Sequence, residues 1–179
     1  MRAALRQDPD VIMVGGVHNY ETGGLAFQAA VEGCLVLASG YGMEACETGN
    51  RFIEMGVEPY LVAHGLRGAL TLRLARQLCG KCRKAYKPSP ETANLLGVGG
   101  PLYQADGCEY CRGRGCSGMC AFHEVMTLND AQREVLLRRG SPQEVRAAAT
   151  DFVSLREDGL RKVSDGRVAL EQFVRVMSD

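Results

Sequence analysis

DVIMVG, at residues 10–15, is a short and unbroken apolar run that follows an Asp-Pro pair and ends at a glycine. A second run of the same kind, LVLAS, occupies residues 35–39. Apolar runs of this length, bounded by Gly, Pro and Asp, are typical of buried strands in a parallel sheet. The sequence therefore predicts an α/β fold that contains these two strands.

The segment between the two runs has the spacing of a helix. Apolar and small residues recur at helical intervals over residues 21–32, and Asn19 is a competent N-cap. A strand, a crossover helix and a second strand form one right-handed βαβ unit. Downstream, residues 44–55 and 59–78 are predicted to continue as helices, the first of which ends at Gly56.

The chain is predicted to be helical again after residue 123, with clear start positions. Asn129 can cap one helix, and the stretches SPQE at 141–144 and SLRE at 154–157 are capping boxes. In the first of these boxes, proline occupies the first helical position, where it is favoured. A last short helix is predicted over residues 170–177.

Residues 79–120 differ from both flanks because Gly, Pro and Cys cluster there. Periodicity is lost between residues 87 and 107, which predicts a small metal-stapled insertion and no helix. We therefore expect three parts: a partial α/β core over 1–78, a metal-binding subdomain over 79–122 and a helical region over 123–179.

The composition excludes several classes of protein. Lys+Arg and Asp+Glu both number 21, so the net charge is zero and nothing favours nucleic acid as a partner. The longest nearly uncharged stretches, at 11–20 and 33–42, are too short and too rich in glycine to span a bilayer. The first residues do not form a signal-peptide pattern, so we expect a reducing cytosol, where paired cysteines favour metal sites.

Four of the eight cysteines form two Cys-x-x-Cys pairs, Cys79 with Cys82 and Cys108 with Cys111. Two residues between thiolates let one tight turn direct both sulfurs at one ion, and a second turn completes the tetrahedron that Zn²⁺ accepts. Four protein ligands leave no open position for water, so the predicted zinc is structural. Neighbouring basic residues would offset the charge of the thiolates, and these are Lys81, Arg83, Lys84 and Arg112.

Other residues are weaker candidates for this site. Cys116 and Cys120 lie nearby, but their three-residue gap fits a metal-binding turn less well, and His123 is a further possible ligand. A redox pair is the alternative for any single Cys-x-x-Cys. Cys34 and Cys46 lie in the α/β part and are expected to be small buried apolar residues.

The stretch LRQDPDVIMVG, residues 5–15, resembles the segment that leads into the Walker B strand of the ATPases of type II secretion and type IV pilus assembly. The resemblance covers essentially the whole chain. Besides the paired cysteines, the stretches that are similar to the family are 21–22, 28–30, 55–60, 66–68, 107–109 and 154–160.

This resemblance implies a fold and a setting. The fold is α/β: a partial RecA-like, P-loop NTPase parallel sheet with flanking helices, a four-cysteine zinc subdomain and a helical C-terminus. Members of the family are cytoplasmic hexameric motors that use ATP and Mg²⁺. They drive the assembly of a pilus or pseudopilus through partners in the inner membrane.

The departures from the family concern polar positions. The family follows its Walker B strand with Gly-Glu-Ile-Arg-Asp, but GGVHN stands at 15–19, so that Gly16 replaces the glutamate. Tyr41 stands where the family has a histidine after its second strand, and Leu72-Arg73 stands where it has a Gln-Arg pair before the cysteines. The family's phosphate-binding loop would lie upstream of Met1.

Phosphoryl transfer depends on a phosphate-binding loop, Mg²⁺ and a water-orienting residue, and this sequence presents none of them in recognisable form. We therefore expect no catalytic and no nucleotide-binding residue among the 179, with ATP and Mg²⁺ doubtful as cofactors. The first hypothesis is an inactive relic or pseudo-subunit of the motor. The alternatives are an ATPase subunit that another chain completes, and a zinc-stapled protein-binding module.

The expected partners follow from the first hypothesis. They are copies of the chain itself or a full-length family ATPase, together with inner-membrane platform proteins. No nucleic acid and no direct membrane insertion are expected, and the location is the cytoplasm. Plain interpretations apply to the remaining polar residues. Asp8 and Asp10 are expected to be turn residues, and Arg67 and Arg73 to lie on a helix, either near a subunit interface or on a solvated face. His18 and His64 are expected to be partly exposed, with no evident partner and no catalytic part.

Overall fold

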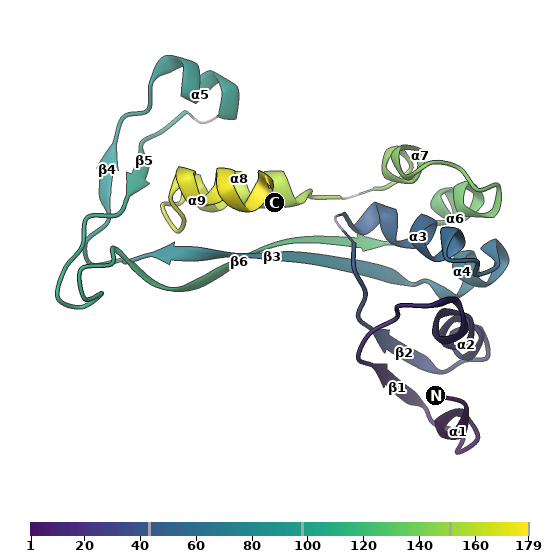
Figure 1. Ribbon diagram of the computed structural model, residues 1–179. Coiled ribbons are helices and arrows are strands. Elements are labelled where there is room, and N and C mark those ends of the chain that lie inside the picture. Colours follow the sequence, from purple (N-terminus) through teal and green to yellow (C-terminus); the bar gives the residue numbers. More distant parts are fainter. Residues whose placement is uncertain (43, 98, 151, 179) are drawn as a thin grey trace. The chain divides into compact units, whose positions relative to one another are not determined.

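The computed structural model describes residues 1–42, 44–97, 99–150 and 152–178. The chain forms two compact units (Figure 1). Unit 1 contains Met1–Thr71 and Val125–Phe152, and unit 2 contains Leu72–Glu124 and Val153–Asp179. The three parts predicted from the sequence, 1–78, 79–122 and 123–179, concern separable domains and stay a prediction.

Unit 1 begins with the βαβ element that the sequence predicts. After the short helix α1 (Arg2–Leu5), strands β1 (Val11–Val14) and β2 (Leu35–Ala38) pair in parallel, with Val11 opposite Leu35. Helix α2 (Tyr20–Val31) connects them. The predicted cap is confirmed, because the side chain of Asn19 accepts a hydrogen bond from the backbone N–H of Thr22 at 2.9 Å.

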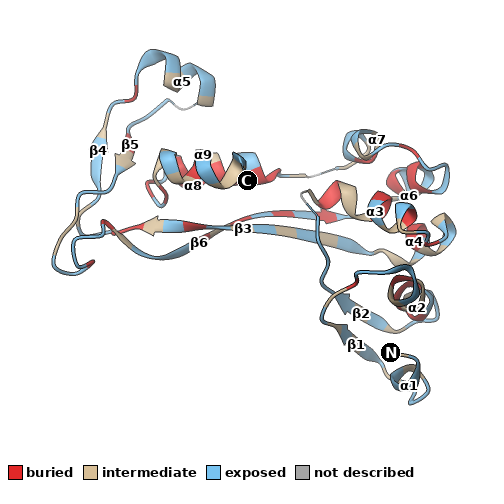
Figure 2. Cartoon of the chain, in the orientation of Figure 1, coloured by how far each residue is buried: buried red, intermediate tan, exposed pale blue. Residues whose placement is uncertain are grey.

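The prediction that these strands are buried on both faces is wrong. Val11, Leu35 and Leu37 are more than half exposed, and Met13 is 82% exposed (Figure 2). Only the alternate residues of β1 are half-buried. The described residues form three separate two-stranded sheets, of which the β1–β2 pair is parallel as predicted. A larger, RecA-like parallel sheet therefore stays a prediction.

The helices of unit 1 enclose a small apolar core. They are η1 (Ala45–Glu47), α3 (Thr48–Glu54), α4 (Pro59–Gly65), α6 (Asp130–Leu137) and α7 (Pro142–Ala147). Their core includes Phe27, Val62 and Leu136. The predicted end of the helix before Gly56, which is α3, is confirmed. Gly56 has φ +104, a backbone conformation that other residues adopt only at a cost.

The predicted helix over 59–78 is wrong beyond Gly65. Residues Gly68–Leu78 form strand β3, which pairs with β6 (Cys116–Thr127). Side chains along β3 alternate between exposed and more buried positions, which is the period of a strand. Leu, Ala and Arg are good helix formers, so intrinsic propensity favours a helix here, and pairing with β6 overrides it.

Unit 2 contains a second small sheet and three helices. Strands β4 (Lys84–Tyr86) and β5 (Leu102–Gln104) pair antiparallel. Helix α5 (Pro90–Leu96) follows β4 and precedes β5 in the sequence, and the side chain of Ser89 caps it. The prediction that this stretch contains no helix is therefore wrong. Helices α8 (Leu155–Ser164) and α9 (Leu170–Ser178) complete the unit.

The predicted capping boxes after residue 123 are confirmed. The Ser154 hydroxyl accepts from the backbone N–H of Glu157, and the Glu157 carboxylate accepts from the backbone N–H of Ser154. Ser141 and Glu144 form the same reciprocal pair at the start of α7. No helix in the described part of the chain is long and apolar enough to cross a bilayer.

Candidate functional site

Four cysteines from two turns of unit 2 converge on one point. Cys79 follows β3 directly, Cys82 lies in the turn before β4, and Cys108 and Cys111 lie in the loop between β5 and β6. Each turn is closed by backbone hydrogen bonds, such as the one from the N–H of Arg83 to the carbonyl of Cys79 at 3.0 Å. The fold thus brings together all four residues that the sequence singles out.

The distances between the sulfurs fit a tetrahedral ion. The four Sγ atoms all lie within 4.8 Å of one another. Three of the edges measure 3.9 Å for Cys79–Cys108, 3.8 Å for Cys82–Cys111 and 3.8 Å for Cys108–Cys111. Zn–S bonds of about 2.3 Å in a regular tetrahedron give edges of about 3.8 Å. The cluster therefore has the size that zinc requires.

Backbone N–H groups point at two of the sulfurs. The Sγ of Cys111 accepts from the N–H groups of Cys108 and Gly115, both at 3.2 Å, and the Sγ of Cys82 accepts from the N–H of Gly107 at 3.3 Å. Hydrogen bonds to sulfur favour the thiolate, which is the form that binds a metal. Such donors are the usual outer shell of a thiolate site.

The pKa values of two cysteines move in opposite directions. Burial, with the neighbouring thiols adding to its effect, raises the pKa of Cys82 to about 12 against the opposing N–H of Gly107. Burial also acts to raise the pKa of Cys111, but the N–H donors of Cys108 and Gly115 and two neighbouring thiols lower it to about 6. Four adjacent sulfurs therefore do not all ionise without a cation, and a divalent cation that displaces the protons satisfies them together.

The basic residues near the cluster have partners of their own. The ammonium of Lys81 lies 4.3 Å from the ring centroid of Tyr110, and Lys84 pairs with Asp106 at 2.9 Å. The guanidinium of Arg83 donates to the carbonyls of Asp165 and Gly166. The positive charges of Lys81, Arg83 and Lys84, which the sequence predicts to offset the negative thiolates, therefore also serve these other contacts.

The weaker candidates for metal ligands lie outside the four-sulfur cluster. Cys116 begins β6, and Cys120 is a buried member of the apolar core. His123 is half-exposed and lies beside the carboxylate of Asp158. In unit 1, Cys46 is buried as expected, whereas Cys34 is only partly buried.

A buried charge network between β6 and α8 was missed in the sequence. The carboxylate of Asp158, 1% exposed, accepts from Lys162, from the side chain of Arg161 and from the backbone N–H of His123. Burial acts to raise the pKa of Asp158, but these donors, Lys162 first, lower it on balance. The only sign of this network in the sequence is the i, i+4 spacing of Asp158 and Lys162 on a capped helix, and the same spacing is typical of ion pairs on the surface.

The sequence matches the type II/IV secretion system protein family over residues 1–175. The type IV pilus assembly ATPase PilB of Thermus thermophilus is 40% identical over 182 residues, which cover 97% of this chain and 20% of that protein. The type II secretion system protein E of Pseudomonas aeruginosa is 38% identical over 181 residues, 98% of this chain and 36% of that protein. The chain belongs to the type II/IV secretion system protein family.

A solved structure has a similar fold. The ATPase DotB of Legionella pneumophila superposes with a TM-score of 0.65 at 18% identity, over 99% of this chain and 41% of that one. At this identity the likeness concerns the fold alone. The chain spans only 20% to 36% of the length of the two curated type II/IV secretion relatives above.

Gly16 and Tyr41, the two positions where the resemblance predicts a glutamate and a histidine, lie just beyond the carboxyl ends of β1 and β2. The strand ends are joined by hydrogen bonds from the N–H of Ser39 to the carbonyl of Val14, at 3.1 Å, and from the N–H of Val17 to the carbonyl of Ser39, at 2.9 Å. Ligands of parallel α/β sheets bind at this edge. Residues 15–19 and 39–42 contain no Asp or Glu.

Two aromatic rings lie close together at these strand ends. The imidazole of His18 fills the space that a Cβ at position 16 would enter. Its ring lies 5.4 Å from the ring of Tyr41, centroid to centroid, at an interplanar angle of 33°. His18 therefore has an aromatic neighbour, contrary to the expectation of a side chain without a partner.

The other polar residues considered in the sequence lie elsewhere. Arg67 lies between α4 and β3, and Arg73 lies on β3, where its guanidinium donates to the carbonyl of Val176 at 2.6 Å. Neither lies on a helix, so that expectation is wrong for both. His64 contacts Tyr60, with ring centroids 4.5 Å apart.

Proposed function

We propose that this chain is a non-hydrolysing subunit or relic of a type II secretion or type IV pilus motor. The observation that carries the proposal is Gly16 under the imidazole of His18, where the resemblance places a glutamate. Without a carboxylate at this strand end, nothing there orients an attacking water or supports Mg²⁺. The core of the fold is kept while the polar active-site positions are replaced.

The four-cysteine cluster is proposed to hold a structural zinc ion. The sulfur–sulfur distances near 3.8 Å and the three N–H···S bonds support this proposal. With Cys79, Cys82, Cys108 and Cys111 as ligands, the tetrahedron has no open position, so the ion would fix the turns around it and take no part in hydrolysis.

The proposed partners are copies of this chain or a full-length ATPase of the family, acting in the cytoplasm beneath inner-membrane platform proteins. The exposed apolar side chains of β1 and β2 support an association of this kind, because exposed apolar strand faces favour contact with another chain. An ATPase subunit that another chain completes remains the alternative, and the missing carboxylate weighs against it.

A mixing experiment tests the proposal. A full-length family ATPase is titrated with this chain, and co-elution and total Mg-ATP turnover are followed together. The expected result is co-elution with a total turnover that stays constant or falls, because the added subunit does not hydrolyse. Separate elution, or a turnover that rises in proportion to the added chain, would contradict the proposal.

A further inference from the structure

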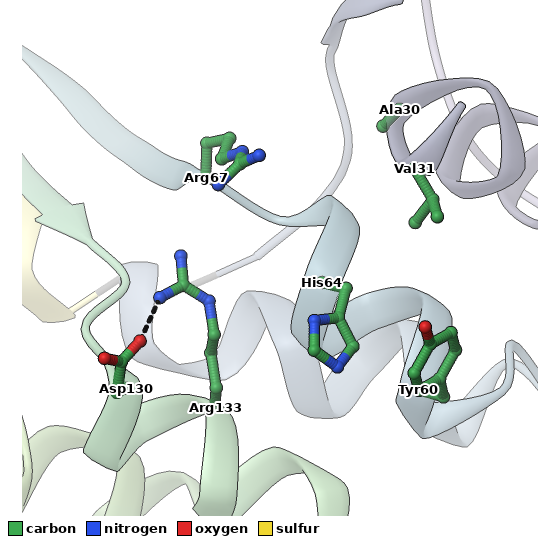
Figure 3. Close-up of a pocket in the computed structure, with 7 residues that line it drawn as sticks. All are labelled: Ala30, Val31, Tyr60, His64, Arg67, Asp130 and Arg133. Atoms are coloured by element: carbon green, nitrogen blue, oxygen red, sulfur yellow. Dashed lines mark hydrogen bonds and ion pairs between the residues drawn. The ribbon is translucent and has the colours of Figure 1, made fainter. Parts of the chain in front are cut away.

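Unit 1 carries a pocket that is separate from the strand ends and from the cysteine cluster. It has a volume of about 410 Å³, which lies within the range of small-ligand pockets. Figure 3 shows its walls, which come from the end of α2, from α4, from the segment before β3 and from α6. Its lining residues are Ala30, Val31, Tyr60, His64, Arg67, Asp130 and Arg133.

Two arginines give one part of this pocket a positive charge. The guanidinium of Arg67 forms no ion pair or hydrogen bond with any residue that the structure describes. Arg133 pairs with Asp130, whose side chain is 97% exposed, at 2.8 Å. A well-hydrated surface pair of this kind contributes little, so Asp130 is readily replaced by a stronger anion. The pocket thus holds two guanidinium groups and one exposed carboxylate, which among the described residues pairs with Arg133 alone.

Arg133 is held in place before any ligand arrives. Its side chain is only 21% exposed, and its Nε donates to the backbone carbonyl of Ala63, at the end of α4, at 3.2 Å. In Figure 3 its side chain rises from α6 toward Arg67, while His64 and Tyr60 line the side formed by α4. A guanidinium fixed through Nε keeps its outer N–H groups for bidentate contact with an oxyanion.

The rest of the pocket suits a ring. The rings of Tyr60 and His64 lie 4.5 Å apart at an interplanar angle of 49°, and Ala30 and Val31 add apolar surface on the side of α2. Aromatic side chains stack on planar ligands with a modest gain beyond the burial of area. The pocket therefore combines a cationic end and an aromatic wall.

We propose that this pocket binds a small organic anion in which a phosphate or carboxylate group is attached to a ring. The oxyanion lies between Arg67 and Arg133, and the ring lies against Tyr60, His64 and Val31. This site is independent of the strand ends at Gly16, so it stands whether or not the chain hydrolyses ATP.

The test uses four probes on the whole protein: phenyl phosphate, benzoate, inorganic phosphate and phenol. Binding is followed by calorimetry and by the NMR shifts of the His64 and Tyr60 rings. Phenyl phosphate or benzoate is expected to bind roughly tenfold more tightly than inorganic phosphate, because the ring adds a stacking contact. The ratio of the first two probes shows which anion is preferred.

Two variants and a control decide the outcome. Arg67→Gln, which breaks no hydrogen bond or ion pair among the described residues, should weaken the binding of phenyl phosphate by about tenfold or more, and Arg133→Gln should do the same. Arg139→Gln removes the same charge from the exposed turn that follows α6 and should change nothing. Equal binding of phenol and phenyl phosphate, no shift at either ring, or equal weakening by the control would overturn the proposal.

Discussion

The backbone N–H of His123, on β6, donates a hydrogen bond to the carboxylate of Asp158, on α8, with N and Oδ2 3.0 Å apart. The same oxygen accepts from Lys162, one turn further along α8, and Lys162 also donates to the carbonyl of Ala121. Both charged side chains are almost fully buried. This network joins a strand to a helix within unit 2 through a buried ion pair.

Lys162→Met should lower the free energy of unfolding by about 3–5 kcal/mol, because it leaves the Asp158 carboxylate buried without its ammonium partner. Denaturant unfolding with a fitted slope measures the change. The control is Lys84→Met, which removes the same charge from an exposed pair with Asp106, so its effect should be within about 1 kcal/mol. Similar losses in both variants would show that the ion pair is not the stabilising element.

The lowered pKa of Asp158 also predicts how stability depends on pH. In the unfolded chain this carboxyl titrates near its ordinary value of about 3.9, so the unfolded state binds the proton more readily. The stability that Asp158 contributes is therefore present above that value and is lost as the pH falls through the lower, folded-state pKa. As the pH is lowered from about 5, the melting temperature of Asp158→Asn should fall less steeply than that of the wild type. An equally steep fall in the two proteins would contradict this.

The cysteine cluster predicts about one zinc per chain in protein purified without chelator. Cys108→Ser should lower the zinc content sharply and loosen the loop between β5 and β6, while the β1–α2–β2 element of unit 1 keeps its structure. Cys116→Ser is the control, because Cys116 lies outside the cluster, and it should keep the metal. Elemental analysis measures both, and a metal-free protein that is equally well folded would contradict the zinc assignment.

Hydrogen exchange should separate the two strands of unit 1 from the last three helices. The amides of Val11–Val14 and of residues 35–37 should exchange far faster than those of α7, α8 and α9. The strands pair only with each other in the described structure and expose large apolar side chains. By contrast, α7 and α8 begin with capping boxes, and all three helices contribute buried side chains to an apolar core. Strands that are the most protected part of a clean monomer would instead indicate a self-sufficient domain, and would favour the protein-binding module.

Local chemistry let the sequence predict where helices start and which four cysteines converge. Asn19, Ser141 and Ser154 each cap a helix through their own side chains, and two Cys-x-x-Cys turns need little beyond their spacing to meet. The failures depend on distant partners. Residues 68–78 became a strand because β6 pairs with them, although their composition favours a helix.

The burial of individual side chains also could not be predicted from the sequence. The apolar run at 10–15 indicates a strand, but whether anything covers its second face depends on other segments, and Met13 is exposed among the described residues. The charge network of Asp158 and Lys162 could not be told from a surface pair, because its backbone partners are distant in the sequence. The N–H of His123 donates to Asp158 from 35 residues away, and the carbonyl of Ala121 accepts from Lys162, 41 residues away. The pocket beside Arg67 likewise needs α2, α4 and α6 to be folded together.

The rate of Mg-ATP hydrolysis by the purified protein tests the proposed absence of catalysis most directly. We predict turnover no higher than the blank for the wild type and for Gly16→Glu, because His18 fills the space at position 16 and the 179 residues contain no Gly-x-x-x-x-Gly-Lys-Ser/Thr loop. Turnover above the blank that is abolished by His18→Ala or Tyr41→Ala would contradict the account, since the residues at the strand ends would then take part in catalysis.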